Sequence, residues 1–169
     1  KMCRSNKNSA VILLNGSPVD MSAWIEACPA IIEAWYPGEQ GAQAITEIIF
    51  GQTNPSGKLP ITFPRSVGQL PLFYSMKPSG RGYGYVDNDG SPLYPFGYGL
   101  SYTSFEFDNF TLNNTDNKLK ISFSAKNTGD FDGEEVIQIY FSGRSCDVVM
   151  ALKELKAYKR FRLNKNEAL

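Results

Sequence analysis

A stretch rich in proline and glycine separates two differently patterned halves of the chain and most constrains its fold. Between Thr53 and Gly99 these residues recur so often that long helices and central strands are excluded. Proline stands at positions 55, 60, 64, 71, 78, 92 and 95, and glycine at 57, 68, 80, 82, 84, 90, 97 and 99. The same stretch holds too many Phe and Tyr residues for a disordered linker. We expect an ordered connector that its aromatic rings hold across a surface.

The part before the connector alternates short apolar runs with helical patterns. Residues 10–14 form a continuous apolar run, which is typical of a strand buried on both faces, and residues 30–35 resemble a second one. A short helix is expected near Trp24, and a longer one over 39–50 with Gly51 just past its end. The order strand, helix, strand, helix predicts an α/β layer with a parallel sheet.

From Ser101 onward, apolar and polar residues alternate, as in half-buried antiparallel strands. The alternation is clearest over 119–125, and further strands are expected near 105–110, over 136–141 and near 155–163. A complete β-sandwich of this kind has roughly seven strands, whereas about four are recognisable here. We therefore expect an incomplete all-β sandwich, truncated at its end. Because the apolar run 10–14 begins so soon after Lys1, we also expect the natural N-terminus to lie upstream of Lys1.

The chain contains no histidine, which narrows the chemistry available to it. Ser–His–Asp and Cys–His catalysis, His-ligated zinc and a histidine pH switch are excluded within it. Its 17 basic and 17 acidic residues balance, which argues against a nucleic-acid partner, and no apolar run is long enough for a membrane span. The cysteines Cys3, Cys28 and Cys146 lack metal-ligand spacing, so we expect no metal site, and their disulfide state stays open.

Three near-matches to ligand-binding motifs fail. From Gly51 to Lys58, one residue too many separates the glycines of a phosphate-binding loop. The run from Gly82 to Gly84 begins a dinucleotide fingerprint, but Asp87 occupies the place of its third glycine. The run 87–91 starts like a calcium-binding loop, but Tyr98 stands where such a loop needs its bidentate glutamate. Turns explain these segments more simply.

Glycoside hydrolysis needs a pair of carboxyl groups, one on each side of the scissile bond. The candidates before the connector are Asp20, Glu26, Glu33, Glu39 and Glu47. Solvated helix faces or the helix dipole account for all except Glu33, which lies in an apolar strand. A strand-end carboxylate facing solvent is the simpler interpretation of Glu33. We expect no complete catalytic pair in this chain.

Four stretches together resemble the C-terminal part of glycoside hydrolase family 3, the β-glucosidase and β-xylosidase family. They are residues 11–19 (VILLNGSPV), 34–41 (AWYPGEQG) leading into 49–51 (IFG), 54–64 (NPSGKLPITFP) and 94–103 (YPFGYGLSYT). The tail from Ser104 resembles the family's fibronectin type III-like domain, with matching stretches at 126–130 and 153–160. The resemblance implies three segments: 1–65 as the end of the α/β sandwich domain, 66–100 as the connector and 101–169 as a truncated fibronectin type III-like sandwich.

The same resemblance implies a retaining, exo-acting β-glycosidase that acts on terminal β-linked sugars without a cofactor. The family's nucleophile, an aspartate on a barrel domain, and its acid/base glutamate both match no position of this chain. The implied role of these residues is therefore scaffold and domain docking, with the barrel and the rest of the α/β domain as partners in the parent chain. The resemblance also favours a periplasmic or extracellular location.

Three positions depart from the family pattern: Ala42 replaces a common Gly, Tyr98 a frequent His, and Gly84 an Arg. The last change removes a multi-donor group that could anchor the connector to sugar or to a neighbouring domain. An alternative function is a carbohydrate-binding or adhesion module, in which exposed rings of Tyr83, Tyr85 and Tyr94 stack on sugars. Packing of these rings within the connector is the simpler interpretation.

Overall fold

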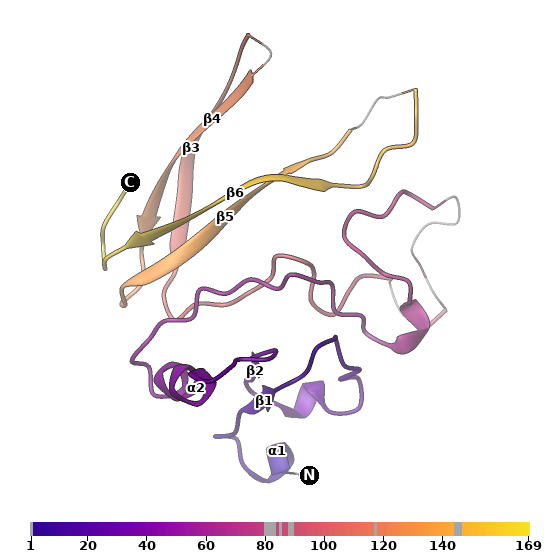
Figure 1. Ribbon diagram of the computed structural model, residues 1–169, viewed down its shortest axis with the longest axis vertical. Coiled ribbons are helices and arrows are strands. Elements are labelled where there is room, and N and C mark those ends of the chain that lie inside the picture. Colours follow the sequence, from indigo (N-terminus) through magenta and orange to yellow (C-terminus); the bar gives the residue numbers. More distant parts are fainter. Residues whose placement is uncertain (1, 80–83, 85, 88–89, 117, 144–146) are drawn as a thin grey trace.

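The regular secondary structure of the computed structural model is mostly β-strand with few helices, and the structure describes residues 2–79, 84, 86–87, 90–116, 118–143 and 147–169. Its elements are α1 (Met2–Ser5), β1 (Val11–Leu13), η1 (Ile25–Ala27), β2 (Ile31–Glu33), α2 (Gly41–Ile49), η2 (Val67–Gln69), β3 (Phe105–Thr115), β4 (Lys118–Asn127), β5 (Gly133–Phe141) and β6 (Glu154–Leu163). Figure 1 shows α1, β1, β2 and α2 at one end, the pairs β3–β4 and β5–β6 at the other, and the connector between them. No helix in the described ranges has the length and apolar character of a membrane span.

Strands β1 and β2 pair in parallel, as the alternation of strand and helix predicted. The Val11 N–H donates to the Ala30 carbonyl and the Ala34 N–H to the Leu13 carbonyl, both at 2.9 Å. The expected burial on both faces is wrong for this chain, because the Ile12 side chain is 39% exposed. Within the described residues β1 has β2 as its one strand neighbour, so the sheet is too small to cover both faces.

Helix α2 begins later than the sequence predicted and ends where it predicted. A turn at Gly38 (φ +71°) keeps Glu39 and Gln40 outside the helix, and the Gly41 N–H donates to the Gly38 carbonyl. At the other end Gly51 adopts φ +70°, the left-handed conformation that glycine tolerates without a steric penalty. The short helix expected near Trp24 is a turn followed by the three-residue η1, since Pro29 leaves no room for a longer one.

The proline- and glycine-rich stretch 53–99 folds back on itself, so that residues 58–63 lie beside residues 93–98. The Leu59 N–H donates to the Tyr98 carbonyl at 2.7 Å, and the Gly97 N–H donates to the Leu59 carbonyl at 2.8 Å. Further along, the Phe63 N–H donates to the Tyr94 carbonyl at 2.8 Å. These bonds pair backbone groups that the frequent prolines and glycines keep out of regular secondary structure.

Aromatic rings join the connector to both ends of the molecule. The ring of Phe63, 1% exposed, lies 6.1 Å from that of Trp35, just after β2. The ring of Phe96 stacks on Tyr74 at 4.1 Å and meets the edge of Tyr140, on β5, at 6.5 Å. Ring pairs of this geometry stabilise by about 0.5–1.5 kcal/mol each beyond their buried area.

Strands β3–β4 and β5–β6 form two antiparallel pairs, which face each other through phenylalanines. The rings of Phe105 and Phe107 on β3 each lie 6.2 Å from the ring of Phe161 on β6. The C-terminal residues then run along β4, where Ala125 and Leu169 exchange backbone hydrogen bonds of 2.9 and 2.8 Å. The apolar core here is centred on Ala125 and Leu163, both almost fully buried.

Candidate functional site

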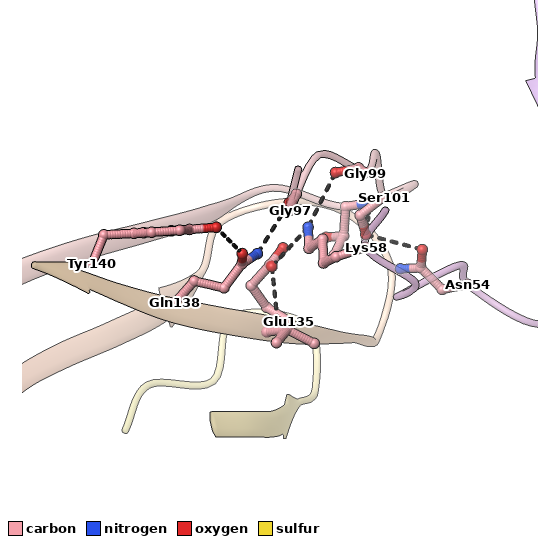
Figure 2. A network of polar contacts seen from close by, with 10 residues as sticks. Asn54, Lys58, Gly97, Gly99, Ser101, Glu135, Gln138 and Tyr140 are labelled. Atoms are coloured by element: carbon pink, nitrogen blue, oxygen red, sulfur yellow. Dashed lines mark hydrogen bonds and ion pairs between the residues drawn. The ribbon is translucent and has the colours of Figure 1, made fainter. Parts of the chain in front are cut away.

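An ion pair ties Lys58, in the proline- and glycine-rich stretch 53–99, to β5. The Lys58 ammonium lies 2.8 Å from a Glu135 carboxylate oxygen, and the two side chains are only 16% and 14% exposed. Lys58 also donates to the Gly99 carbonyl at 3.0 Å, and the Glu135 carboxylate accepts the Val136 N–H at 2.8 Å (Figure 2). Both charges are thus paired and hydrogen-bonded, which is the condition for burying them without a large penalty.

A second set of polar contacts follows β5 toward its end. The Gln138 amide donates to the Gly97 carbonyl at 3.0 Å, and the Tyr140 hydroxyl donates to the Gln138 carbonyl oxygen (Figure 2). Burial, and secondly the neighbouring Tyr74, raise the pKa of the Tyr140 hydroxyl. The Lys153 ammonium lies 4.9 Å from the centre of the Tyr140 ring, a cation–π distance. Gly97 adopts φ +82° at this contact.

Asn54 makes the third link between the segments. Its side-chain oxygen accepts the Ser101 hydroxyl and the Tyr102 N–H, both at 2.9 Å. Its amide nitrogen donates to the Asp132 carbonyl at 3.0 Å, directly before β5. The Tyr102 hydroxyl in turn donates to the Ile48 carbonyl at 2.8 Å, near the C-terminal end of α2.

A buried amide organises the strands behind this junction. The Asn127 side chain, 0% exposed, accepts the Thr103 hydroxyl at 2.6 Å and the Gly129 N–H at 3.1 Å. Its nitrogen donates to the Phe131 carbonyl at 2.8 Å and to the Leu163 carbonyl at 3.3 Å. All four hydrogen-bonding positions of the amide are therefore occupied. The junction consists of these contacts and those of Lys58, Asn54 and Gln138, and we call it the docking junction.

The carboxylates considered from the sequence serve local structure. Glu33 accepts the Trp35 N–H at 3.1 Å and the Asn15 amide at 3.4 Å, so it holds the turn after β2. The Asp20 carboxylate accepts the Ser22 N–H at 2.9 Å, and contacts with Ser22 lower the pKa of Asp20. The Glu47 carboxylate accepts hydrogen bonds from Gln43 at 2.8 Å and Thr53 at 3.2 Å. Glu26 and Glu39 are exposed.

Of the tyrosines considered for sugar binding, Tyr83 and Tyr85 lie outside the described residues. The Tyr94 ring is half-buried, stacks on the ring of Tyr98 at 4.9 Å and meets the edge of Phe63 at 6.4 Å. Burial, and secondly Tyr98, raise the pKa of the Tyr94 hydroxyl. No group of Cys, Asp and Glu side chains in the described part of the chain could hold a metal ion.

The sequence patterns predict no role for Lys58, Glu135, Gln138 or Asn127. Lys58 and Asn127 lie in stretches that carried the resemblance, and this was the one signal available for them. Glu135 and Gln138 stand in an ordinary alternating strand, where polar side chains are normally solvated. The fold alone brings them to the connector.

The comparisons with known proteins show to which family this chain belongs. The model of the glycosyl hydrolase family 3 C-terminal domain matches residues 1–102. The chain belongs to glycoside hydrolase family 3.

Two curated relatives show how much of such a protein this chain represents. It is 39% identical to a periplasmic β-glucosidase of Salmonella typhimurium, over 96% of this chain and 23% of that protein. It is 40% identical to a β-xylosidase of Formosa agariphila, over 97% of this chain and 24% of that protein. The chain therefore spans about a quarter of the length of these relatives.

Solved structures show the same relation. A β-glucosidase from Erythrobacter marinus superimposes with a TM-score of 0.88 at 43% identity, over 95% of this chain and 22% of that one. A β-glucosidase from Listeria innocua in complex with glucose gives a TM-score of 0.88 at 32% identity, over 95% of this chain and 24% of that one.

The ion pair of the docking junction gives a first prediction. Lys58→Met is expected to lower the free energy of unfolding by about 2 kcal/mol, because it leaves the Glu135 carboxylate buried without its partner. The double variant Lys58→Met/Glu135→Gln should recover about 1 kcal/mol of that loss, since no unpaired charge remains. Urea denaturation of the three proteins measures both values.

Lys165→Met provides the matched control. Its ammonium lies 2.8 Å from Asp130, the same separation, but the two side chains are 50% and 82% exposed. Solvent screens such a pair, so its removal should change stability far less than that of Lys58. Equal effects of Lys58→Met and Lys165→Met would show that burial does not strengthen the contact at the docking junction.

Proposed function

We propose that the whole protein is a retaining β-glucosidase-like hydrolase acting on terminal β-linked sugars. The observation that carries this proposal is the similarity to β-glucosidases over 95% of the chain, at a TM-score of 0.88. Curated relatives include β-glucosidases and a β-xylosidase, so the sugar could be glucose or xylose. The balanced charge of the chain suits a neutral substrate, which needs no electrostatic steering.

Within that enzyme, this chain acts as scaffold and as the docking site between domains. Neither the catalytic nucleophile nor the acid/base lies in it. The local hydrogen bonds of Glu33, Asp20 and Glu47 support this assignment, because each carboxylate is engaged in holding a turn or a helix end. The partners of the chain are the barrel domain and the rest of the α/β domain, and its chemistry requires no cofactor.

The division into segments is part of the same proposal. Residues 1–65 would be the end of an α/β sandwich domain, which the parallel pairing of β1 and β2 supports. Residues 66–100 would be the connector, and residues 101–169 part of a fibronectin type III-like sandwich. The facing rings of Phe105 and Phe161, between β3–β4 and β5–β6, support a sandwich arrangement.

The proposed location is the periplasm or the cell exterior. The relative from Salmonella typhimurium is named a periplasmic enzyme, and it covers 96% of this chain at 39% identity.

The test of the proposed function compares two proteins on one chromogenic β-glucoside. The purified 169-residue chain is expected to give no turnover above a mock purification, because the catalytic carboxylates are absent from it. A longer protein that contains this chain after a barrel domain is expected to hydrolyse the same substrate and to retain the anomeric configuration. Turnover that copurifies with the 169-residue chain would overturn the scaffold assignment, and a longer protein without turnover would overturn the hydrolase.

A further inference from the structure

Two thiols from segments far apart in the sequence meet beside the small parallel sheet. Cys3 lies in α1, and Cys28 is the residue that ends η1, in extended backbone conformation. The two side chains lie within hydrogen-bonding reach of each other, and the Cys28 thiol also donates to the Ala30 carbonyl at 3.2 Å. Both cysteines are free and partly exposed.

Contacts that do not involve sulfur also bring the two segments that carry the thiols close together. Two residues beyond Cys28, the Ala30 carbonyl accepts the Val11 N–H at 2.9 Å, so the chain after Cys28 is held to β1. On the other side, Arg4 of α1 and Trp24 and Glu26 near η1 line one shallow pocket of about 260 Å³. Helix α1 therefore lies against the segment that carries Cys28.

We propose that Cys3 and Cys28 form a disulfide bond when the protein meets a disulfide oxidant. The oxidant is a low-molecular-weight disulfide such as glutathione disulfide, or a thiol–disulfide oxidoreductase. One protein thiolate attacks a sulfur of glutathione disulfide, which gives a mixed disulfide and releases one glutathione. The second protein thiolate then displaces the other glutathione. Two electrons pass to the glutathione disulfide, and the two thiol protons end on the two glutathione molecules.

The rate of disulfide formation should depend on pH, and the proposed location of the protein is one in which disulfides persist. Burial, and secondly contact with Cys3, raise the pKa of the Cys28 thiol. Because the thiolate is the attacking species, oxidation of the pair should accelerate as the pH rises toward that raised pKa. The proposed disulfide does not depend on catalytic activity. In the proposed periplasmic or external location it would persist once formed.

The decisive measurement is the redox equilibrium of the chain in glutathione buffers, with and without urea. A pair held together by the fold has a higher effective concentration than the same pair in an unfolded chain. At half-oxidation of the cysteine pair, the square of the glutathione concentration divided by the glutathione disulfide concentration measures the stability of the disulfide. This ratio should therefore be at least about tenfold higher in native buffer than in urea. Non-reducing peptide mapping should show the peptide of Cys3 joined to that of Cys28, with a mass lower by two hydrogen atoms.

Single substitutions complete the test. The Cys146→Ser variant should show the same cross-link and the same midpoint, whereas Cys3→Ser should lose the cross-link and accept only glutathione on Cys28. A midpoint that urea leaves unchanged would overturn the inference, and so would mixed disulfides with glutathione as the sole products in the native protein. Circular dichroism of Cys3→Ser verifies that its fold is intact, so that a missing cross-link reports on the thiol.

Discussion

Asn127→Ala is expected to lower the free energy of unfolding by about 3–4 kcal/mol, because the side chain is fully buried and fully hydrogen-bonded. The substitution removes four hydrogen bonds from a fully buried position. It leaves the carbonyls of Phe131 and Leu163 without this donor, where the bond to Leu163 is buried and the bond to Phe131 is partly buried. Urea denaturation, followed by circular dichroism, measures the change.

Two further variants separate the amide's hydrogen bonds from its volume. Asn113→Ala removes an exposed asparagine from β3 and should change stability by less than about 0.5 kcal/mol. Asn127→Asp preserves the shape of the side chain but replaces the nitrogen that donates to two carbonyls with an oxygen. The carboxyl pKa of this variant should rise in the folded state, so its stability should fall as the pH increases above about 4. A stability of Asn127→Asp that does not change with pH would contradict the hydrogen-bond assignment.

The repeating patterns predicted the elements well, because each depends on residues close together in the sequence. The apolar runs around Val11 and Ile31 gave the two parallel strands, and Gly51 gave the end of α2. The period-two alternation over 119–125 gave the middle of β4. Element boundaries were less accurate, since the turn at Gly38 rather than local propensity determines where α2 begins.

The docking junction could not be predicted in the same way, because its contacts join residues far apart in the chain. Lys58 and Glu135 are each ordinary surface-type residues, and only the fold places them 2.8 Å apart with little exposure. Asn127 precedes a Thr–Gly turn, where turn chemistry is a sufficient local explanation. Its four partners come from the segment before β3, the turn after β4 and the end of β6.

Gly97 has a left-handed backbone conformation and also lies against side chains of β5. Gly97→Ala is therefore expected to destabilise the chain by about 3 kcal/mol. A Cβ atom at this position would lie 2.1 Å from the Gln138 carbonyl oxygen and 2.7 Å from the Tyr140 hydroxyl. Gln138 cannot simply rotate away, because its amide donates to the Gly97 carbonyl and its oxygen accepts from Tyr140. The methyl group must therefore break the contact between the connector and β5. Thermal or urea denaturation measures the loss.

Gly38→Ala separates the clash from the backbone strain. Gly38 has a similar dihedral, φ +71° against +82°, but no atom would lie within 4 Å of an added Cβ. It should lose only the roughly 1 kcal/mol that a left-handed alanine costs. The double variant Gly97→Ala/Gln138→Ala should be more stable than the sum of its single effects, because it removes the side chain that the methyl group meets. Equal losses for Gly38→Ala and Gly97→Ala would mean that backbone strain alone, rather than contact with β5, requires glycine at position 97.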